Sequence, residues 1–113
     1  MPNLIMEYSV GLAKRHSVPD LLAQTHQAAV ASQLFKLDAI KVRAIPFDSY
    51  LVGGEERSFV HTTITLLDGR SPEEKKALAK AVVEAQTQCW QGVASVTVDV
   101  RDMDRRFFQK VCS

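Results

Sequence analysis

The sequence has few cysteines and no marked excess of either charge. Cys89 and Cys112 are the only two cysteines among 113 residues, and they lie far apart with no metal-ligand spacing. We therefore expect both thiols to stay reduced, as is usual in the cytoplasm. The formal net charge is only +1, which gives no electrostatic reason to expect nucleic acid or an anionic membrane as a partner.

Long apolar runs are also missing. No stretch approaches the roughly 20 residues that a membrane helix needs, and the N-terminus lacks the basic region and apolar stretch of a signal peptide. Hydrophobic residues make up 46% of the chain and charged residues 24%, which is typical of an ordinary globular protein. We expect one domain over residues 1–113 and a cytoplasmic location, at a chain length for which oligomers are common.

The first half of the sequence predicts a strand, a helix and a second strand. Residues 3–9 form a short strand-like run, and residues 21–35 place apolar side chains at helical spacing, after Pro19 and Asp20 at a helix entry. Residues 39–47 alternate as a strand does, with Pro46 favouring the end or the edge of a sheet.

The second half repeats this order. After a hairpin loop or flap over residues 48–57, residues 59–67 alternate clearly as a strand, and Ser71 with Glu74 forms a capping box around Pro72. The helix that follows is expected to end near Trp90, and Val96, Val98 and Val100 mark a half-buried strand. The tail from Asp104 to Cys112 is expected to contain a short helix with exposed apolar side chains.

The two halves overlay as a pattern, with residues 38–48 falling on residues 94–104 at a constant offset of 56. At that offset Pro2 falls on Ser58. The predicted fold class is α+β, an α/β sandwich in which two β-α-β units form one four-stranded sheet with both helices on one face. The other face would then need a cover, and further copies of the chain in a closed ring are the simplest supply.

Pro2 is the residue with the most chemical interest. If Met1 is removed, the chain begins with a secondary amine at a strand end. An α-amino group titrates near about 8, and burial lowers that pKa toward neutrality, where a general base works well. Two interpretations remain open, because Pro2 can also be a residue that only signals methionine removal or ends a strand without a chemical role.

Several motifs together resemble the tautomerase superfamily, and most closely the 5-carboxymethyl-2-hydroxymuconate isomerases. They are Met1-Pro2-Asn3-Leu4-Ile5-Met6-Glu7-Tyr8-Ser9, Phe59-Val60-His61-Thr62-Thr63 and Gly69-Arg70-Ser71, and the resemblance covers nearly the whole chain. It implies a tautomerase-like fold, a homotrimer, and the N-terminal proline as catalytic base. It also implies a small acidic substrate, a ring-cleavage product of aromatic compound catabolism.

Three cations are candidates for binding the substrate's carboxylates. Arg70 follows Gly69 just before a helix and matches the family's Gly-Arg-Ser, and its guanidinium suits a bidentate carboxylate contact. Lys41 and Arg43 share one face of a strand because their spacing is two. Related tautomerases carry an arginine near the position of Lys41, so the lysine bears on specificity. A turn arginine in water and an edge-strand pair facing water are the alternative interpretations.

The resemblance predicts a keto–enol isomerase that needs no metal or other cofactor, since fixed donors can meet the charge on the enolate oxygen. A decarboxylase or dehalogenase that uses the same proline, and a non-catalytic trimeric binding protein, remain as alternatives. His61, Trp90 and the Phe107-Phe108 pair are interpreted as packing or subunit contacts.

Overall fold

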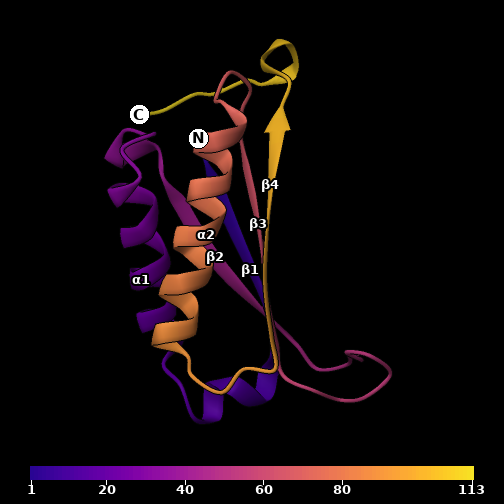
Figure 1. Cartoon of the computed structure of the whole chain (residues 1–113). Coiled ribbons are helices and arrows are strands. Elements are labelled where there is room, and N and C mark those ends of the chain that lie inside the picture. Colours follow the sequence, from indigo (N-terminus) through magenta and orange to yellow (C-terminus); the bar gives the residue numbers. More distant parts are fainter.

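The computed structural model describes residues 1–113 and contains one four-stranded sheet with two helices packed on one face (Figure 1). The strand order is β2-β1-β3-β4. The strands are β1 (Asn3–Ser9), β2 (Lys41–Phe47), β3 (Phe59–Leu67) and β4 (Ser95–Met103), and the helices are α1 (Val18–Ala31) and α2 (Pro72–Cys89). Short 3-10 turns cover Val10–Lys14, Leu37–Ala39 and Arg105–Phe107. The predicted fold class is confirmed.

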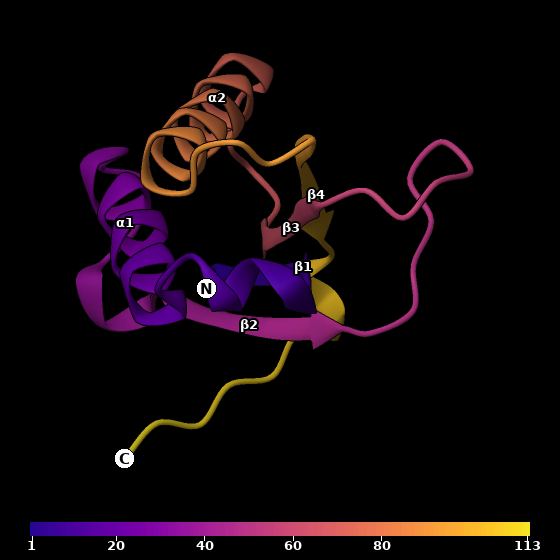
Figure 2. The same ribbon diagram turned by 90° about the horizontal axis from the view of Figure 1, so that it is seen from below.

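Each half is a β-α-β unit with parallel strands, and the two units meet antiparallel at the centre. Strand β1 pairs parallel with β2 and antiparallel with β3, and β3 pairs parallel with β4. Figure 2 shows both helices on the same side of the sheet. The edge position of β2 agrees with Pro46, because proline has no backbone N–H to donate to a neighbouring strand.

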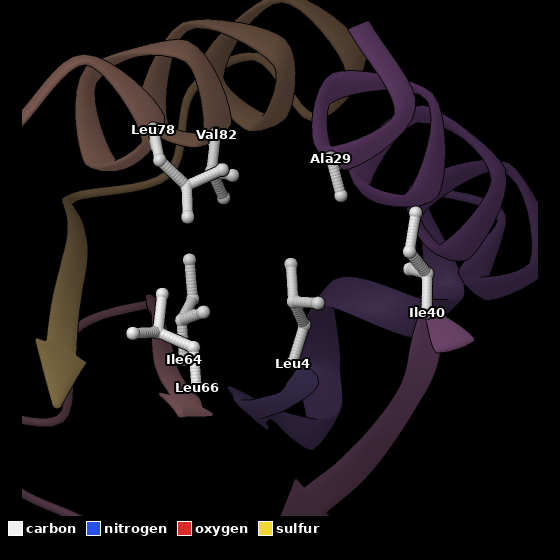
Figure 3. Packing of buried hydrophobic residues seen from close by; sticks show 7 residues of the cluster. All are labelled: Leu4, Ala29, Ile40, Ile64, Leu66, Leu78 and Val82. Carbon is white, nitrogen blue, oxygen red and sulfur yellow. The ribbon is translucent and has the colours of Figure 1, made fainter. Parts of the chain in front are cut away.

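The main core lies between the sheet and the helices. Figure 3 shows its central cluster, which is formed by Leu4, Ala29, Ile40, Ile64, Leu66, Leu78 and Val82. Alternate residues of β1 and β3 point to this face, because successive side chains of a strand point to opposite sides. A second cluster around Trp90 and Tyr8 closes the other end of the same layer.

Four sequence-based predictions need correction. Helix α1 begins at Val18 and ends at Ala31, because Ser32 bonds back to the Ala29 carbonyl and Gln33 takes a positive φ of 60°. Strand β2 begins only at Lys41, after a 3-10 turn. The tail after β4 contains one 3-10 turn instead of a short helix over residues 104–112, since its residues have almost no core to pack on.

The fourth correction concerns the internal repeat. Asn3 pairs with Lys41 and Phe59 pairs with Ser95, so the first strands of the two units differ by 56 positions and the second strands by 54. The offset is therefore not constant. Because the difference is two residues, side chains still point to the same faces.

The second face of the sheet is not covered by a helix. It presents Lys41, Arg43, Ile45 and Phe47 from β2, with the odd-numbered residues of β1, β3 and β4 beside them. We call this surface the open face. None of the helices combines the length and apolarity needed to cross a bilayer, and no group of three His, Cys, Asp or Glu side chains gathers as a metal site.

Candidate active site

The start of β1 lies at the end of the sheet where several chemically interesting groups meet. Strands β1 and β2 begin at this end, while β3 and β4 finish there, because the central pair is antiparallel. The turn from β3 into α2 therefore reaches the same end as Pro2. We call this region the Pro2 end, and it is at the upper part of the sheet in Figure 1.

Pro2 itself is buried, and its carbonyl accepts a hydrogen bond from the Lys41 backbone N–H at 3.1 Å. Because Pro2 has no N–H to donate, its position before the first ladder residue leaves no strand bond unmade. The contact fixes the beginning of β1 directly against the beginning of β2.

The α-amino group of Met1, one residue before Pro2, has a pKa below its usual value. Burial is the largest cause, and the positive charges of Lys110, Lys41 and Arg70 act in the same direction, against an opposing effect of Cys112. Burial and like charges both disfavour the ammonium form. This end of the protein is therefore a place where an amine is held toward its neutral, basic form.

Arg70 is held in place by contacts on several sides. Its guanidinium donates to the Leu34 carbonyl at 2.8 Å and to the Leu67 carbonyl at 3.3 Å, and it lies 5.0 Å from the centre of the Phe35 ring. Gly69, with a φ of 117°, allows the chain to turn sharply before it. These contacts connect the end of α1 to the turn between β3 and α2.

Lys41 and Arg43 both lie on the open face, as the spacing of two predicts, and both are exposed. Lys41 pairs with Asn3 beside the amine, while Arg43 pairs with Ile5, about 6.6 Å further along the strand. Arg43 is not among the charges that act on the amine. The structure thus brings Lys41 and Arg70 to the Pro2 end and leaves Arg43 further along β2.

Sequence reasoning missed Phe35 and Lys110. Phe35 was placed on a helix, and only the early end of α1 puts its ring under Arg70. Lys110 lies on an irregular tail with no periodic pattern, so nothing in the sequence linked it to Pro2. The only feature of the sequence that could have suggested Lys110 was the presence of a basic residue near the C-terminus.

An open groove of about 550 Å³ lies beside Arg70 and is also lined by Asp68, Glu74 and Arg105, but Pro2 does not line it. A more apolar groove between α1 and α2 carries the carboxylates of Glu74 and Glu84 and no cation, so it does not suit an acidic ligand. Within one chain, the groups of the Pro2 end face an open surface without an enclosing cavity.

The remaining residues noted from the sequence lie elsewhere. His61 is on the open face, where its Nδ1 is 2.7 Å from Thr97 Oγ1. Trp90 is buried in the second core cluster, and Phe107 is 79% exposed. Burial raises the pKa of the Cys89 thiol, with Asp20 adding to the effect, so this thiol is in its unreactive form.

Comparison with known proteins decides the family. The 5-carboxymethyl-2-hydroxymuconate isomerase family matches residues 2–98. The chain belongs to this family. A search among curated protein sequences found no significant match.

Solved structures show the same fold. A 5-carboxymethyl-2-hydroxymuconate isomerase from Deinococcus radiodurans R1 is 23% identical and superposes with a TM-score of 0.86, over 99% of this chain and 90% of that one. A fused 4-OT wild-type symmetric trimer is 22% identical, with a TM-score of 0.78 over 90% of this chain and 85% of the other. A member of the cis-3-chloroacrylic acid dehalogenase family is 12% identical, with a TM-score of 0.78 over 96% and 79%. The chain therefore has the tautomerase fold of an isomerase family.

Proposed function

We propose that the protein is a cofactor-free keto–enol isomerase with Pro2 as its general base after removal of Met1. Its substrate would be an unsaturated 2-hydroxy or 2-oxo acid with two or three carboxylates, such as 5-carboxymethyl-2-hydroxymuconate. The observation that carries this proposal is the Pro2 end itself, where a buried proline begins β1 beside an amine of lowered pKa and the cations Lys41 and Arg70.

The reaction moves one proton. The Pro2 nitrogen accepts the proton of the enol hydroxyl, the electrons of the O–H bond shift through the conjugated chain, and the same nitrogen returns the proton to a carbon further along. A C–H bond replaces an O–H bond, and no oxidant or reductant is involved. A base with a pKa near the working pH can both accept and return the proton. Proton transfer by such a base typically accelerates a reaction about 10²–10⁴-fold.

The cations have two effects in this proposal. Arg70 and Lys41 bind the carboxylates and meet the negative charge that grows on the oxygen as the proton leaves. They also keep the proline nitrogen unprotonated, because like charges disfavour its cationic form. Arg43, one pleat further from the amine, would contribute more weakly at the rim of the same face.

We further propose a homotrimer in which neighbouring chains enclose the Pro2 end. The open face carries apolar side chains such as Ile5, Ile45 and Phe47 beside the cations, and no cavity within one chain contains Pro2. The fused 4-OT relative is a symmetric trimer. Light scattering is expected to give three times the chain mass, and a stable monomer at micromolar concentration would contradict the assembly. We place this trimer in the cytoplasm, where both thiols stay reduced.

The decisive experiment compares Pro2→Ala with Ser58→Ala, its counterpart at the start of β3. The mass of each intact chain is measured first, and isomerisation of 2-hydroxymuconate-type dienols is then followed by ultraviolet absorbance. Wild type and Ser58→Ala should lack Met1 and be active, while Pro2→Ala should lose at least about 10²-fold in kcat. Full activity in a correctly processed Pro2→Ala protein rules out the proposed base.

The same assay separates the other functions. The fold shared with a dehalogenase-family protein favours a second use of the amine, and product analysis on 3-haloacrylates and β-keto acids tests it. A wild-type chain that keeps Met1 and converts none of these substrates is the result expected of a non-catalytic binding protein.

A further inference from the structure

The segment after β4, residues 104–113, begins with a firm contact to the turn that carries Arg70. Arg105 Nε donates to Asp68 Oδ1 at 2.6 Å, and the same guanidinium also donates to the Asp68 backbone carbonyl. Asp104 accepts from the Arg106 N–H at 3.0 Å and closes a 3-10 turn. The tail is thus attached at its start to the β3–α2 turn, immediately before Gly69 and Arg70.

From this attachment the tail runs back across the Pro2 end. Figure 1 shows it leaving the end of β4 and crossing the end of the sheet where β1 and β2 begin, and Figure 2 shows it passing on the side opposite the helices. It has no helix or strand after Phe107, and Val111 is 99% exposed. Packing therefore does not hold this part of the tail against the sheet.

Lys110 is the charged group that the tail carries to this place. Its charge lowers the pKa of the terminal amine more than Lys41 or Arg70 does. The part of the tail that carries Lys110 crosses the Pro2 end on the open-face side of the sheet. Lys41 on β2, Arg70 on the β3–α2 turn and Lys110 on the tail are thus the three cations whose charges lower the pKa of the Met1 amine.

We propose that Lys110 is a specificity-determining residue that binds a third carboxylate of the substrate, the one furthest from the reacting enol. The inference rests on the proposed function, since it names which acids that site prefers. Arg70 already donates to two backbone carbonyls, which leaves fewer of its N–H groups for the substrate. Arg70 and Lys41 alone would therefore bind three carboxylates poorly. A lysine on a flexible stem and an unpacked tail suits a carboxylate at the mouth of a site, because it can follow the ligand as it enters and leaves.

The test compares Lys110→Gln with Lys80→Gln, an exposed lysine on α2. With the tricarboxylate 5-carboxymethyl-2-hydroxymuconate, Lys110→Gln should raise KM about tenfold, as expected for one lost charge-assisted contact, and leave kcat within about twofold. With the dicarboxylate 2-hydroxymuconate, KM should stay within twofold, and Lys80→Gln should match wild type for both. An unchanged KM for the tricarboxylate, or equal rises for both substrates, overturns the assignment.

A binding measurement keeps this result separate from the catalytic proposal. Calorimetry with the unreactive acids propane-1,2,3-tricarboxylate and glutarate should show a loss of about tenfold for the tricarboxylate alone in Lys110→Gln. If wild type isomerises nothing but shows this selective loss, the proposed reaction fails and the carboxylate site stands. If wild type is active and binding of both acids is unaffected by the substitution, the proposed reaction stands and the Lys110 assignment fails.

Discussion

The two ends of the sheet share one backbone plan and differ in chemistry. At the Pro2 end, the Pro2 carbonyl accepts from the Lys41 N–H at 3.1 Å, and at the opposite end the Ser58 carbonyl accepts from the Ser95 N–H at the same distance. Ser58 also uses its hydroxyl, which accepts from the Ala94 N–H at 2.9 Å. Thus a proline and a lysine at one end correspond to two neutral serines at the other.

The residues just before the two helix caps repeat this contrast. Arg70 precedes the cap of α2 and lies over Phe35 after α1, while His16 precedes the cap of α1 and stacks on Trp90 after α2, with ring centres 5.3 Å apart. Trp90 is 1% exposed and donates from its indole N–H to the Ser17 carbonyl at 3.1 Å. One end is therefore closed by a buried aromatic ring and the other by a cation, so the side chains decide which end can act on an anion.

The largest expected effect comes from removing the cation that distinguishes the two ends. Arg70→Ala should lower kcat/KM by about 10²-fold or more, which corresponds to about 2.7 kcal/mol, because both carboxylate binding and charge stabilisation are lost. His16→Ala changes the matching position at the other end and should alter kcat/KM less than twofold. Steady-state kinetics on both variants, with circular dichroism to verify folding, make the comparison.

Two results would count against this interpretation. Equal losses in the two variants would mean that both residues act only through the fold. A Lys substitution at Arg70 that restores full activity would mean that charge alone is sufficient, without the planar contacts to Leu34 and Leu67.

Between the two ends of the sheet, the two β-α-β units meet at a cross-strand pair that consists of one apolar residue and one polar residue. Met6 of β1 faces Thr62 of β3. Gln86 of α2 donates to Thr62 Oγ1 at 2.8 Å and to Thr25 Oγ1 at 3.2 Å, and the Thr25 hydroxyl bonds to the Met6 sulfur. The side-chain carbonyl of Gln86 has no partner.

Gln86→Ala is therefore expected to lower the free energy of unfolding by about 2 kcal/mol, because it leaves a cavity and removes the donor of two buried hydroxyls. Denaturant titration measures this loss. Gln86→Met keeps the volume without the unpaired carbonyl and should be the milder change. A larger loss for the Met variant than for the Ala variant would contradict this explanation.

Much of the fold follows from the sequence, because local chemistry specifies it. Ser71 and Glu74 form the predicted capping box, and the alternation over residues 59–67 matches β3 at both boundaries. The faces of Lys41 and Arg43 follow from a spacing of two. In each case neighbouring residues contain all the information required.

Features that depend on tertiary contacts were not predictable. The end of α1 is set by Gln33 at a positive φ, for which no glycine or proline gives a sign. The two-residue difference between the halves is set by strand register. The tail that carries Lys110 is attached through Arg105 to Asp68, 37 positions earlier in the chain. For the candidate site, the N-terminal position of Pro2 suggested its amine as a base. The family resemblance then added the expected roles of Pro2 as base and Arg70 as carboxylate-binding residue, and neither role followed from spacing.

The comparison between Lys41 and Arg43 predicts a shift in pH dependence. Lys41 lowers the pKa of the terminal amine, so Lys41→Gln should raise the pKa of the Pro2 nitrogen in the processed protein. Because the base must be unprotonated, the acid limb of kcat/KM should move to higher pH, and activity near pH 6 should fall more than activity near pH 8. The acid limb reports the pKa of the free enzyme's base.

Arg43→Gln should shift the same limb less, because Arg43 lies further along β2 and charge interactions in water weaken within about 10 Å. The pH profile of kcat/KM from pH 5 to 9 measures both shifts. An acid limb that moves to lower pH in Lys41→Gln, or that moves further in Arg43→Gln, would contradict the placement of Lys41 beside the base.

The smallest expected effects concern the two helix caps. Ser71 accepts from the Glu74 N–H at 3.1 Å and the Glu74 carboxylate accepts from the Ser71 N–H at 2.9 Å, whereas Ser17 accepts only from the Asp20 N–H, at 3.2 Å. Both sites are exposed, and a lost cap costs about 1 kcal/mol.

Ser71→Ala should therefore lower the free energy of unfolding by about 1 kcal/mol and Ser17→Ala by about half as much. Ser71→Asp retains an acceptor and should stay within about 0.3 kcal/mol of wild type. Denaturant midpoints at equal slope measure these differences in the free energy of unfolding. A larger loss for Ser17→Ala than for Ser71→Ala would show that the reciprocal bond of Glu74 does not stabilise the cap of α2.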